Sequence, residues 1–256
     1  ESISVVAVAQ PAHRIDASAA DAASVTEHLD ETVEWWRRWS TATTVDGPYG
    51  HLVERSALVL KSLNYALSGA IIAAPTTSLP EIVGGHANWD YRYCWVRDAT
   101  LTLQALSTVG HVEMAHGFRD FIMRSAAGHG AELQIMYSIL GERRLPEFEL
   151  DLEGWRESRP VRMGNAAAKQ TQLDVYGHLL LAAHLWQGHA TDGVDADEWR
   201  FLASVVERAI DHWKQPDAGI WELRGEPQHY VHSKLMVWVA LDCGISMVEN
   251  FGVDDV

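Results

Sequence analysis

The chain has 256 residues, of which 47% are hydrophobic and 21% are charged, and this is enough apolar material for one ordinary core or two small ones. Its 20 Lys and Arg against 35 Asp and Glu give a net charge of −15, and a surface of this sign repels nucleic-acid phosphates and anionic lipids. The longest apolar stretches, near Leu67–Pro75 and Leu235–Leu241, are shorter than the ~20 residues that a membrane span requires, so we expect a soluble protein with no nucleic-acid or membrane partner.

Apolar spacing along the chain predicts a mostly helical protein. Ser2–Ala9 alternates loosely with β-branched residues and predicts one short strand, which a proline-containing connector follows. After the connector, apolar residues recur at helical spacing in seven segments, each bounded by Gly, Pro or polar turn residues. These segments are Asp21–Thr41, Leu52–Leu67, Ala99–Val109, Glu113–Ser125, Thr171–Gln187, Ala196–Trp213 and Ser233–Asn250.

Long loop segments between these helices carry residues that helix packing does not require. Loops of this length are uncommon in compact helical domains unless they are functional. Their carboxylates and arginines are interleaved with Trp and Tyr, a mixture that suits sugars, whose rings offer apolar faces for stacking and hydroxyls for hydrogen bonds. The alternative is that the aromatic residues only cover the core. The segments are Ile71–Pro80, Glu81–Trp95, Glu147–Asn165 and Lys214–Gln228.

Several common chemistries lack their sequence motifs. The chain has no GxGxxG, GxxxxGK(S/T), HExxH, CxxC or GxSxG, which argues against the usual nucleotide, zinc and serine-hydrolase sites. His229 and His232 are spaced like metal ligands, but no carboxylate or third histidine stands beside them in a ligand pattern, so we expect no metal ion and no cofactor. Cys94 and Cys243 lie in apolar segments, and we expect them to be reduced and buried, which favours the cytoplasm.

The segment from Leu79 to Thr100, LPEIVGGHANWDYRYCWVRDAT, closely resembles the signature of glycoside hydrolase family 15, the family of glucoamylases and bacterial trehalases. That signature is an aromatic-rich loop that ends in Trp-x-Arg-Asp at the start of a helix. Further pieces agree in order and spacing: WWRRWS at residues 35–40, the segment 69–80, SRPVRMGN at residues 158–165 and GIWE at residues 219–222. The resemblance covers essentially the whole chain.

The resemblance implies an all-α fold, the (α/α)6 barrel of the family, here preceded by a short β-strand remnant. Seven predicted helices are fewer than a complete barrel contains, so we expect an incomplete barrel over residues 16–256 that lacks the C-terminal helices. Residues 1–15 are expected to be the tail of a preceding β-sandwich domain or a linker, and both chain ends to be internal to a longer protein. The exposed faces of a partial barrel predict self-association or pairing with the missing part of the chain.

The resemblance also implies a reaction. Members of the family hydrolyse α-glucosidic bonds with inversion, using one carboxylic acid to protonate the leaving oxygen and one carboxylate to activate water. The GIWE match places the general acid at Glu222, where Trp221 and Ile220 would desolvate the carboxyl and favour its protonated form, and it makes Trp221 a substrate-binding residue. The alternative for Glu222 is a solvated loop acid. The family's base lies in a C-terminal segment, and we expect it beyond Val256.

Other site residues are carried over from the same motifs. Arg97 and Asp98 match the pair that grips the hydroxyls of the non-reducing-end glucose, because adjacent donors and acceptors fix vicinal hydroxyls. Asp98 could also N-cap the helix that follows, and the two roles are compatible. Tyr91 and Trp95 match the aromatic floor of this subsite, and Arg159 is placed at the neighbouring rim.

The sequence departs from the family pattern at one position, on the side of the site where the leaving group binds. Fungal glucoamylases carry a second glutamate directly after the acid, where this chain has Leu223. The substrate therefore stays open between an α-glucan or oligosaccharide with maltose-type or isomaltose-type bonds and trehalose. The alternative from another class is a non-catalytic carbohydrate-binding or interaction module on the same fold.

Overall fold

The computed structural model describes residues 22–188 and 195–251, and these residues are mostly helical, as the apolar spacing predicts. The expected strand at Ser2–Ala9 and the expected boundary at residue 15 lie outside the described residues. Seven α-helices occupy the described part of the chain. They are α1 (Ala22–Thr41), α2 (Gly50–Ser62), α3 (Val96–Thr108), α4 (Glu113–Ser125), α5 (Asp174–Gln187), α6 (Ala196–His212) and α7 (Val231–Phe251).

Each predicted helix is found, and the largest difference from the predicted ends is in α2. This helix stops at Ser62 instead of Leu67, because the chain turns back there into a strand pair. Leu67 lies in the turn and is exposed, so it is not part of an apolar stripe. The turn continues through Gly69, where φ is +86° and a Cβ would lie 1.9 Å from the carbonyl oxygen of Gly117, so glycine alone fits this position.

Helix α3 begins three residues earlier than its predicted start, at Val96. Trp95 is its N-cap residue, with an extended backbone and no capping hydrogen bond from its side chain. Asp98 therefore lies inside the first turn, and the expectation that it N-caps the helix is wrong. A carboxylate in this turn is still stabilised by the positive end of the helix dipole.

Within the described ranges, six short strands form three separate antiparallel pairs, β1–β2, β3–β4 and β5–β6. In the second pair Cys94 lies opposite Tyr137 and Trp95 opposite Met136, and all four side chains are buried. Because β3 runs directly into α3, this pairing fixes the chain where the helix begins. The strands are β1 (Asn64–Tyr65), β2 (Ala70–Ile71), β3 (Cys94–Trp95), β4 (Met136–Tyr137), β5 (Phe148–Leu150) and β6 (Val161–Met163), and the 3-10 helices are η2 (Gly130–Glu132), η3 (Trp155–Glu157) and η4 (Ala166–Lys169).

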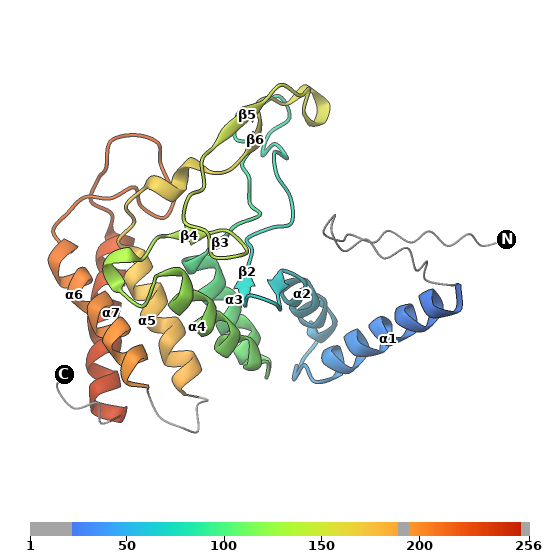
Figure 1. The fold of residues 1–256 in the computed structure, drawn as a ribbon, viewed down its shortest axis with the longest axis horizontal. Coiled ribbons are helices and arrows are strands. Elements are labelled where there is room, and N and C mark those ends of the chain that lie inside the picture. The colour runs from blue at the N-terminus through green and yellow to red at the C-terminus, as the bar shows by residue number, and fades with distance from the viewer. Residues whose placement is uncertain (1–21, 189–194, 252–256) are drawn as a thin grey trace, which may run out of the picture.

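Helices α3 to α7 stand side by side, whereas α1 extends away from them (Figure 1). Helix α5 packs against α3, α4, α6 and α7, and its Leu179, Leu180 and Trp186 are buried, so it forms the centre of the core. Helix α1 contacts the rest of the chain in its C-terminal half, where the ring of Trp39 stacks on His111 with centroids 3.8 Å apart and Ser40 donates a hydrogen bond to Glu54 of α2. The described helices form no closed ring, so the structure confirms the helical class but does not show the expected barrel.

Helix α7 is the one described helix that is long and apolar enough to span a membrane by length and composition, with a mean hydropathy of 1.3 over 18 residues within Val231–Asn250. This differs from the sequence expectation, because that expectation counted uninterrupted apolar residues, whereas the mean over a longer stretch stays high despite its polar residues. One face of α7 packs into the core through Met236, Ala240 and Met247. Trp238 on the other face is exposed. A core helix passes the same test, so this feature is weak support for a membrane contact.

Candidate active site

A pocket of about 290 Å³ lies where the loop before β3, the first turn of α3, η4 and the loop before α7 come together. Its walls combine two carboxylates, two guanidiniums and three aromatic rings. A larger hollow of about 530 Å³ includes no acidic side chain among its lining residues, so the smaller pocket is the candidate site. The residues that line the candidate site are Glu81, Trp89, Tyr91, Arg97, Asn165, Ala167, Ile220, Trp221, Glu222 and Arg224.

Glu222 lies on the loop that joins α6 to α7, in a backbone conformation that side chains rarely adopt. Its φ is +53°, in the left-handed region, and its N–H donates to the carbonyl oxygen of Gly219. The side-chain amide of Gln170 donates to the carbonyl oxygens of Glu222 and Leu223, at 3.1 and 3.3 Å. These contacts hold the loop in the strained conformation, which turns the Glu222 side chain toward α3.

One carboxylate oxygen of Glu222 accepts three hydrogen bonds. The donors to Oε1 are the indole Nε1 of Trp95 at 2.7 Å, Nη2 of Arg97 at 3.2 Å and Nε2 of Gln172 at 3.2 Å. The side chain is 22% exposed, so it is enclosed but still open to the pocket. Because the donors converge on Oε1, the carboxyl is held in one orientation, and Oε2 is the oxygen that remains to carry a proton.

Arg97 connects this carboxylate to two others. Its Nε lies 3.4 Å from Oδ2 of Asp98, its Nη1 lies 3.5 Å from Oδ2 of Asp174, and its Nη2 binds Glu222. Burial raises the pKa of Asp98 and that of Asp174 by more than the charge of Arg97 lowers them. The single guanidinium therefore does not balance the three carboxylates that it contacts.

The aromatic residues named from the sequence lie at this site, but not all in the expected way. Tyr91 lines the pocket, its ring centroid lies 6.3 Å from that of Trp95, and its pKa is raised by burial and by the charges of Glu81 and Glu222. Trp221 also lines the pocket but is 80% exposed, so it does not desolvate Glu222 as expected. Trp95 contacts the carboxyl instead, through the hydrogen bond from its indole N–H.

The structure does not bring Arg159 to this pocket. Its side chain is 62% exposed, and its guanidinium lies 3.9 Å from Asp151 in the loop between β5 and β6. That loop belongs to the hairpin that projects above the helices in Figure 1. We expected Arg159 at the rim of the sugar site because it lies within a family motif. In the structure it lies on the β5–β6 hairpin, away from the pocket.

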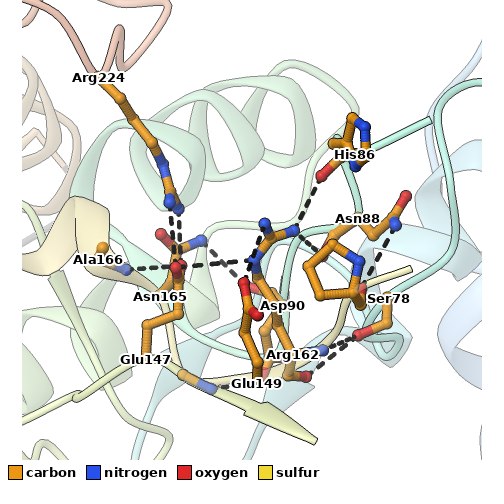
Figure 2. Close-up of polar contacts among 12 residues, drawn as sticks. Ser78, His86, Asn88, Asp90, Glu147, Glu149, Arg162, Asn165, Ala166 and Arg224 are labelled. Atoms are coloured by element: carbon orange, nitrogen blue, oxygen red, sulfur yellow. Dashed lines mark hydrogen bonds and ion pairs between the residues drawn. The ribbon is translucent and has the colours of Figure 1, made fainter. Parts of the chain in front are cut away.

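Sequence reasoning missed a second charged group in the pocket wall. Arg224 donates two hydrogen bonds to Glu147, at 3.0 and 2.6 Å, and Arg162 lies on the other side of the same carboxylate (Figure 2). Both guanidiniums lie over the ring of Trp89, at 4.2 Å for Arg224 and 4.6 Å for Arg162. Burial alone would raise the pKa of Glu147, but hydrogen bonds from Arg224 and the Ala166 N–H lower it overall.

Arg162 also fixes the loop that carries Trp89. Its Nη1 donates to the carbonyl oxygens of His86 and Asn88, and its backbone N–H donates to Ser78 (Figure 2). The guanidinium is almost fully buried. Trp89 is therefore a preorganised wall of the pocket, since the loop on both sides of it is anchored.

Gln170 and Gln172 were also missed, although a signal for them exists in the sequence. The two amides flank Thr171, at the predicted start of helix α5, where helix packing does not require polar side chains. In the structure Gln172 donates to Gln170 and to Glu222 and accepts from Arg97. The pair thus joins the backbone of the Glu222 loop to its side chain.

Comparisons with known proteins identify the family to which this chain is similar. Residues 47–255 match the model of the family described as Glycosyl hydrolases family 15. A trehalase from Mycolicibacterium smegmatis is 46% identical over 227 residues, which are 87% of this chain and 34% of the relative. A trehalase from Thermoplasma acidophilum is 42% identical over 225 residues, 88% of this chain and 38% of the relative. Glucoamylase-1 of Schizophyllum commune is 27% identical over 164 residues, 61% of this chain and 26% of the relative.

The chain thus spans about a third of the length of these trehalases. No solved structure matches it.

Proposed function

The chain belongs to glycosyl hydrolase family 15, and on that premise we propose that it carries the acid half of an inverting α-glucosidase, with Glu222 as the general acid. The observation that carries this proposal is the orientation of Glu222, whose Oε1 accepts from Trp95, Arg97 and Gln172 while the carboxyl faces the pocket. A fixed carboxyl with one free oxygen can hold a proton against the glycosidic oxygen.

The second carboxylate of the mechanism is proposed to lie outside this chain. An inverting enzyme needs its base about 6.5–9.5 Å from its acid, so that a water molecule fits between the base and the sugar. Asp98 and Asp174 both pair with Arg97, which also binds Glu222, so these two carboxylates are engaged in one ion-pair network with the acid. The relatives' additional length is the place where we expect the base.

The sugar that is cleaved off is proposed to rest between Tyr91 and Arg97. The Tyr91 and Trp95 rings supply an aromatic floor, and Arg97 with Asp98 supplies a donor and an acceptor for neighbouring hydroxyls. Trp221, which is exposed at the mouth, would stack on a sugar ring as it enters. Arg159 has no part in this proposal.

The leaving sugar is proposed to meet the wall formed by Trp89, Arg224 and Glu147. Arg224 follows Glu222 by two residues and lines the same pocket, so it lies on the side where Leu223 replaces a glutamate. Its bidentate pairing with Glu147 leaves the guanidinium partly exposed, and the side chain still has N–H groups for a sugar hydroxyl. The names of the relatives support trehalose as the first substrate to test and maltose as the second.

We also propose that the helices belong to the (α/α)6 barrel, or toroid, of the family. Alternate helices α3, α5 and α7 neighbour one another, and α4 and α6 pack against this row. That order is how the inner and outer helices of such a toroid follow each other. The exposed apolar face of α7 is then available to further helices of a longer protein or to a second copy. A cytoplasmic location is proposed from the two buried, unpaired cysteines.

The test compares this chain with a version extended to the length of its relatives. We expect the extended protein to release glucose from trehalose, maltose or isomaltose and the 256-residue chain to release little or none, since loss of general-base assistance alone costs ~10²–10⁴ in rate. Equal specific activity would show that a residue within this chain is the base. Sugar binding without hydrolysis by the extended protein would support a carbohydrate-binding module instead.

A further inference from the structure

Two histidines and an aspartate converge where the first turns of α5 and α7 meet. Asp174 and His178 stand one turn apart on α5, and His232 is the second residue of α7. Nε2 of His178 lies 3.7 Å from Oδ2 of Asp174, and Nδ1 of His232 lies 3.9 Å from the same oxygen. One potential ligand atom from each residue lies within 4.8 Å of the other two.

Three of the four ring nitrogens of these histidines are buried without a hydrogen-bond partner in the part of the chain that the structure describes. His178 is 5% exposed, and both of its ring nitrogens are buried without a partner, as is Nδ1 of His232. Buried polar atoms are nearly always satisfied, because leaving one unpaired costs the free energy of its desolvation. Two of these nitrogen atoms, Nε2 of His178 and Nδ1 of His232, lie beside one carboxylate oxygen of Asp174, and this arrangement needs an explanation.

The packing of the two helices holds these side chains together. A Cβ on Gly177 would lie 2.2 Å from the carbonyl oxygen of Met236, so the absence of a side chain lets α5 and α7 approach closely next to His178. This close packing keeps the buried His178 ring in place, with its Nε2 directed to Asp174.

We infer that Asp174, His178 and His232 form a binding site for a divalent transition-metal ion, for which Zn²⁺ is the best match. Ligand atoms bound to one tetrahedral zinc ion lie roughly 3.4 Å apart, so small side-chain rotations close the observed separations. Two imidazole nitrogens and one carboxylate favour such an ion over Mg²⁺ or Ca²⁺, which prefer oxygen ligands. This inference does not rest on the proposed function.

The surroundings fit a bound cation in two further ways. Asp174 is a buried carboxylate that shares one guanidinium with Asp98 and Glu222, so added positive charge compensates it. Arg97 would then contact the metal-binding carboxylate of Asp174 without binding the ion itself, as residues around the ligands do in metal sites. His232 is 31% exposed, which gives an ion access and leaves room for a water ligand. From the sequence we expected no metal ion, because 54 residues separate His178 from His232 and their proximity is not visible in the sequence.

The experiment uses the 256-residue chain without a histidine tag, freed of metals with a chelator and then desalted. Zn²⁺ binding is measured by calorimetry, and the visible absorption of Co²⁺ reports nitrogen ligation. We expect one equivalent to bind, and we expect His178→Gln and His232→Gln to weaken binding at least ~100-fold, since outer-shell changes alone cost 10–100-fold. The matched control is His184→Gln, an exposed histidine on the same helix, which should bind as the wild type does.

Three results would overturn the inference. The first is no saturable binding of one equivalent of Zn²⁺ by the wild-type chain, which needs no variant to fold. The second is an equal loss of affinity in His184→Gln, which would mean adventitious surface binding. The third is Mg²⁺ competing with Zn²⁺ at equal concentration. Circular dichroism of each variant shows whether it folds. If His178→Gln does not fold, the test relies on His232→Gln, which changes the more exposed of the two histidines.

Discussion

The indole N–H of Trp95 donates to Oε1 of Glu222 at 2.7 Å, although 127 residues separate the two in the sequence. Trp95 is held from both sides, since it pairs with Met136 in β4 and serves as the N-cap of α3. Glu222 is held by the strained loop before α7 and by Gln170. The contact therefore joins the first half of the chain to the second at the point where we propose the chemistry occurs.

Replacing Trp95 with Phe keeps the ring and removes this donor. We expect Trp95→Phe to lower kcat of the extended protein by about 10-fold or more, because Glu222 loses one of three groups that fix its orientation. Steady-state kinetics with trehalose measure the change. Trp155→Phe, at an exposed loop position, is the control and should leave kcat unchanged. Equal kinetics in both variants would mean that the indole N–H has no role.

The Arg224–Glu147 pair is predicted to stabilise the pocket wall. A double-mutant cycle with Glu147→Gln and Arg224→Gln should give a coupling energy of about 0.5–1.5 kcal/mol, above that of an ordinary surface pair because the geometry is bidentate. Urea unfolding of the four proteins measures it. The same single variants should raise KM for a disaccharide more than they lower kcat. Coupling near zero would show that the pair is open in solution.

The loop that carries Glu222 depends on Gly219. Its φ is +67°, and a Cβ there would lie 2.7 Å from the ring of Tyr230, so Gly219→Ala should destabilise the fold by about 1–2 kcal/mol. Gly225 lies on the same loop with nothing within 4 Å of an added Cβ, and Gly225→Ala should change stability by less than about 0.5 kcal/mol. Denaturant titration compares the two. Equal stability of the two variants would contradict the packing of Gly219 on Tyr230.

The helices could be predicted from the sequence because each one buries an apolar face whose residues recur at helical spacing. Helix α6, for example, buries Phe201, Leu202 and Val205. The start of α3 was missed because Trp95 caps it without a polar side chain, so no capping residue marked the place. Motif resemblance identified Glu222, Arg97 and Tyr91, which the structure brings to one pocket.

Contacts made across the fold could not be read in the same way. Arg224 pairs with Glu147 across 77 residues, and nothing in the local pattern of either residue indicates the other. Arg159 was misplaced because a motif neighbour in sequence need not point to the same side of a hairpin. The histidine pair was missed for the same reason as Arg224, since His178 and His232 meet only when α5 packs on α7.

His178 predicts a loss of stability in acid. Its pKa is about 4 in the folded chain against 6.5 for an ordinary histidine, so the unfolded chain binds this proton first as the pH falls. The free energy of unfolding should therefore decrease between pH 6.5 and pH 4, by on the order of 3 kcal/mol from this group, and no further below pH 4. Denaturant unfolding with a chelator present measures it.

The control for this pH dependence is His178→Gln, which cannot take up the proton. Asp174, Arg97 and His232 face the same group in both proteins, so their contributions largely cancel in the comparison. The variant should lose clearly less stability than the wild type over the same pH range. Parallel curves would show that His178 is not the group responsible.

The most direct test of Glu222 as general acid compares two leaving groups in the extended protein. Fluoride leaves α-glucosyl fluoride with little need of a proton, whereas the sugar oxygen of trehalose needs one. Glu222→Gln should lower kcat/KM for trehalose by about 10²–10⁴ and change kcat/KM for α-glucosyl fluoride far less. An equal loss on both substrates, or wild-type turnover of trehalose by Glu222→Gln, would contradict the role assigned to this residue.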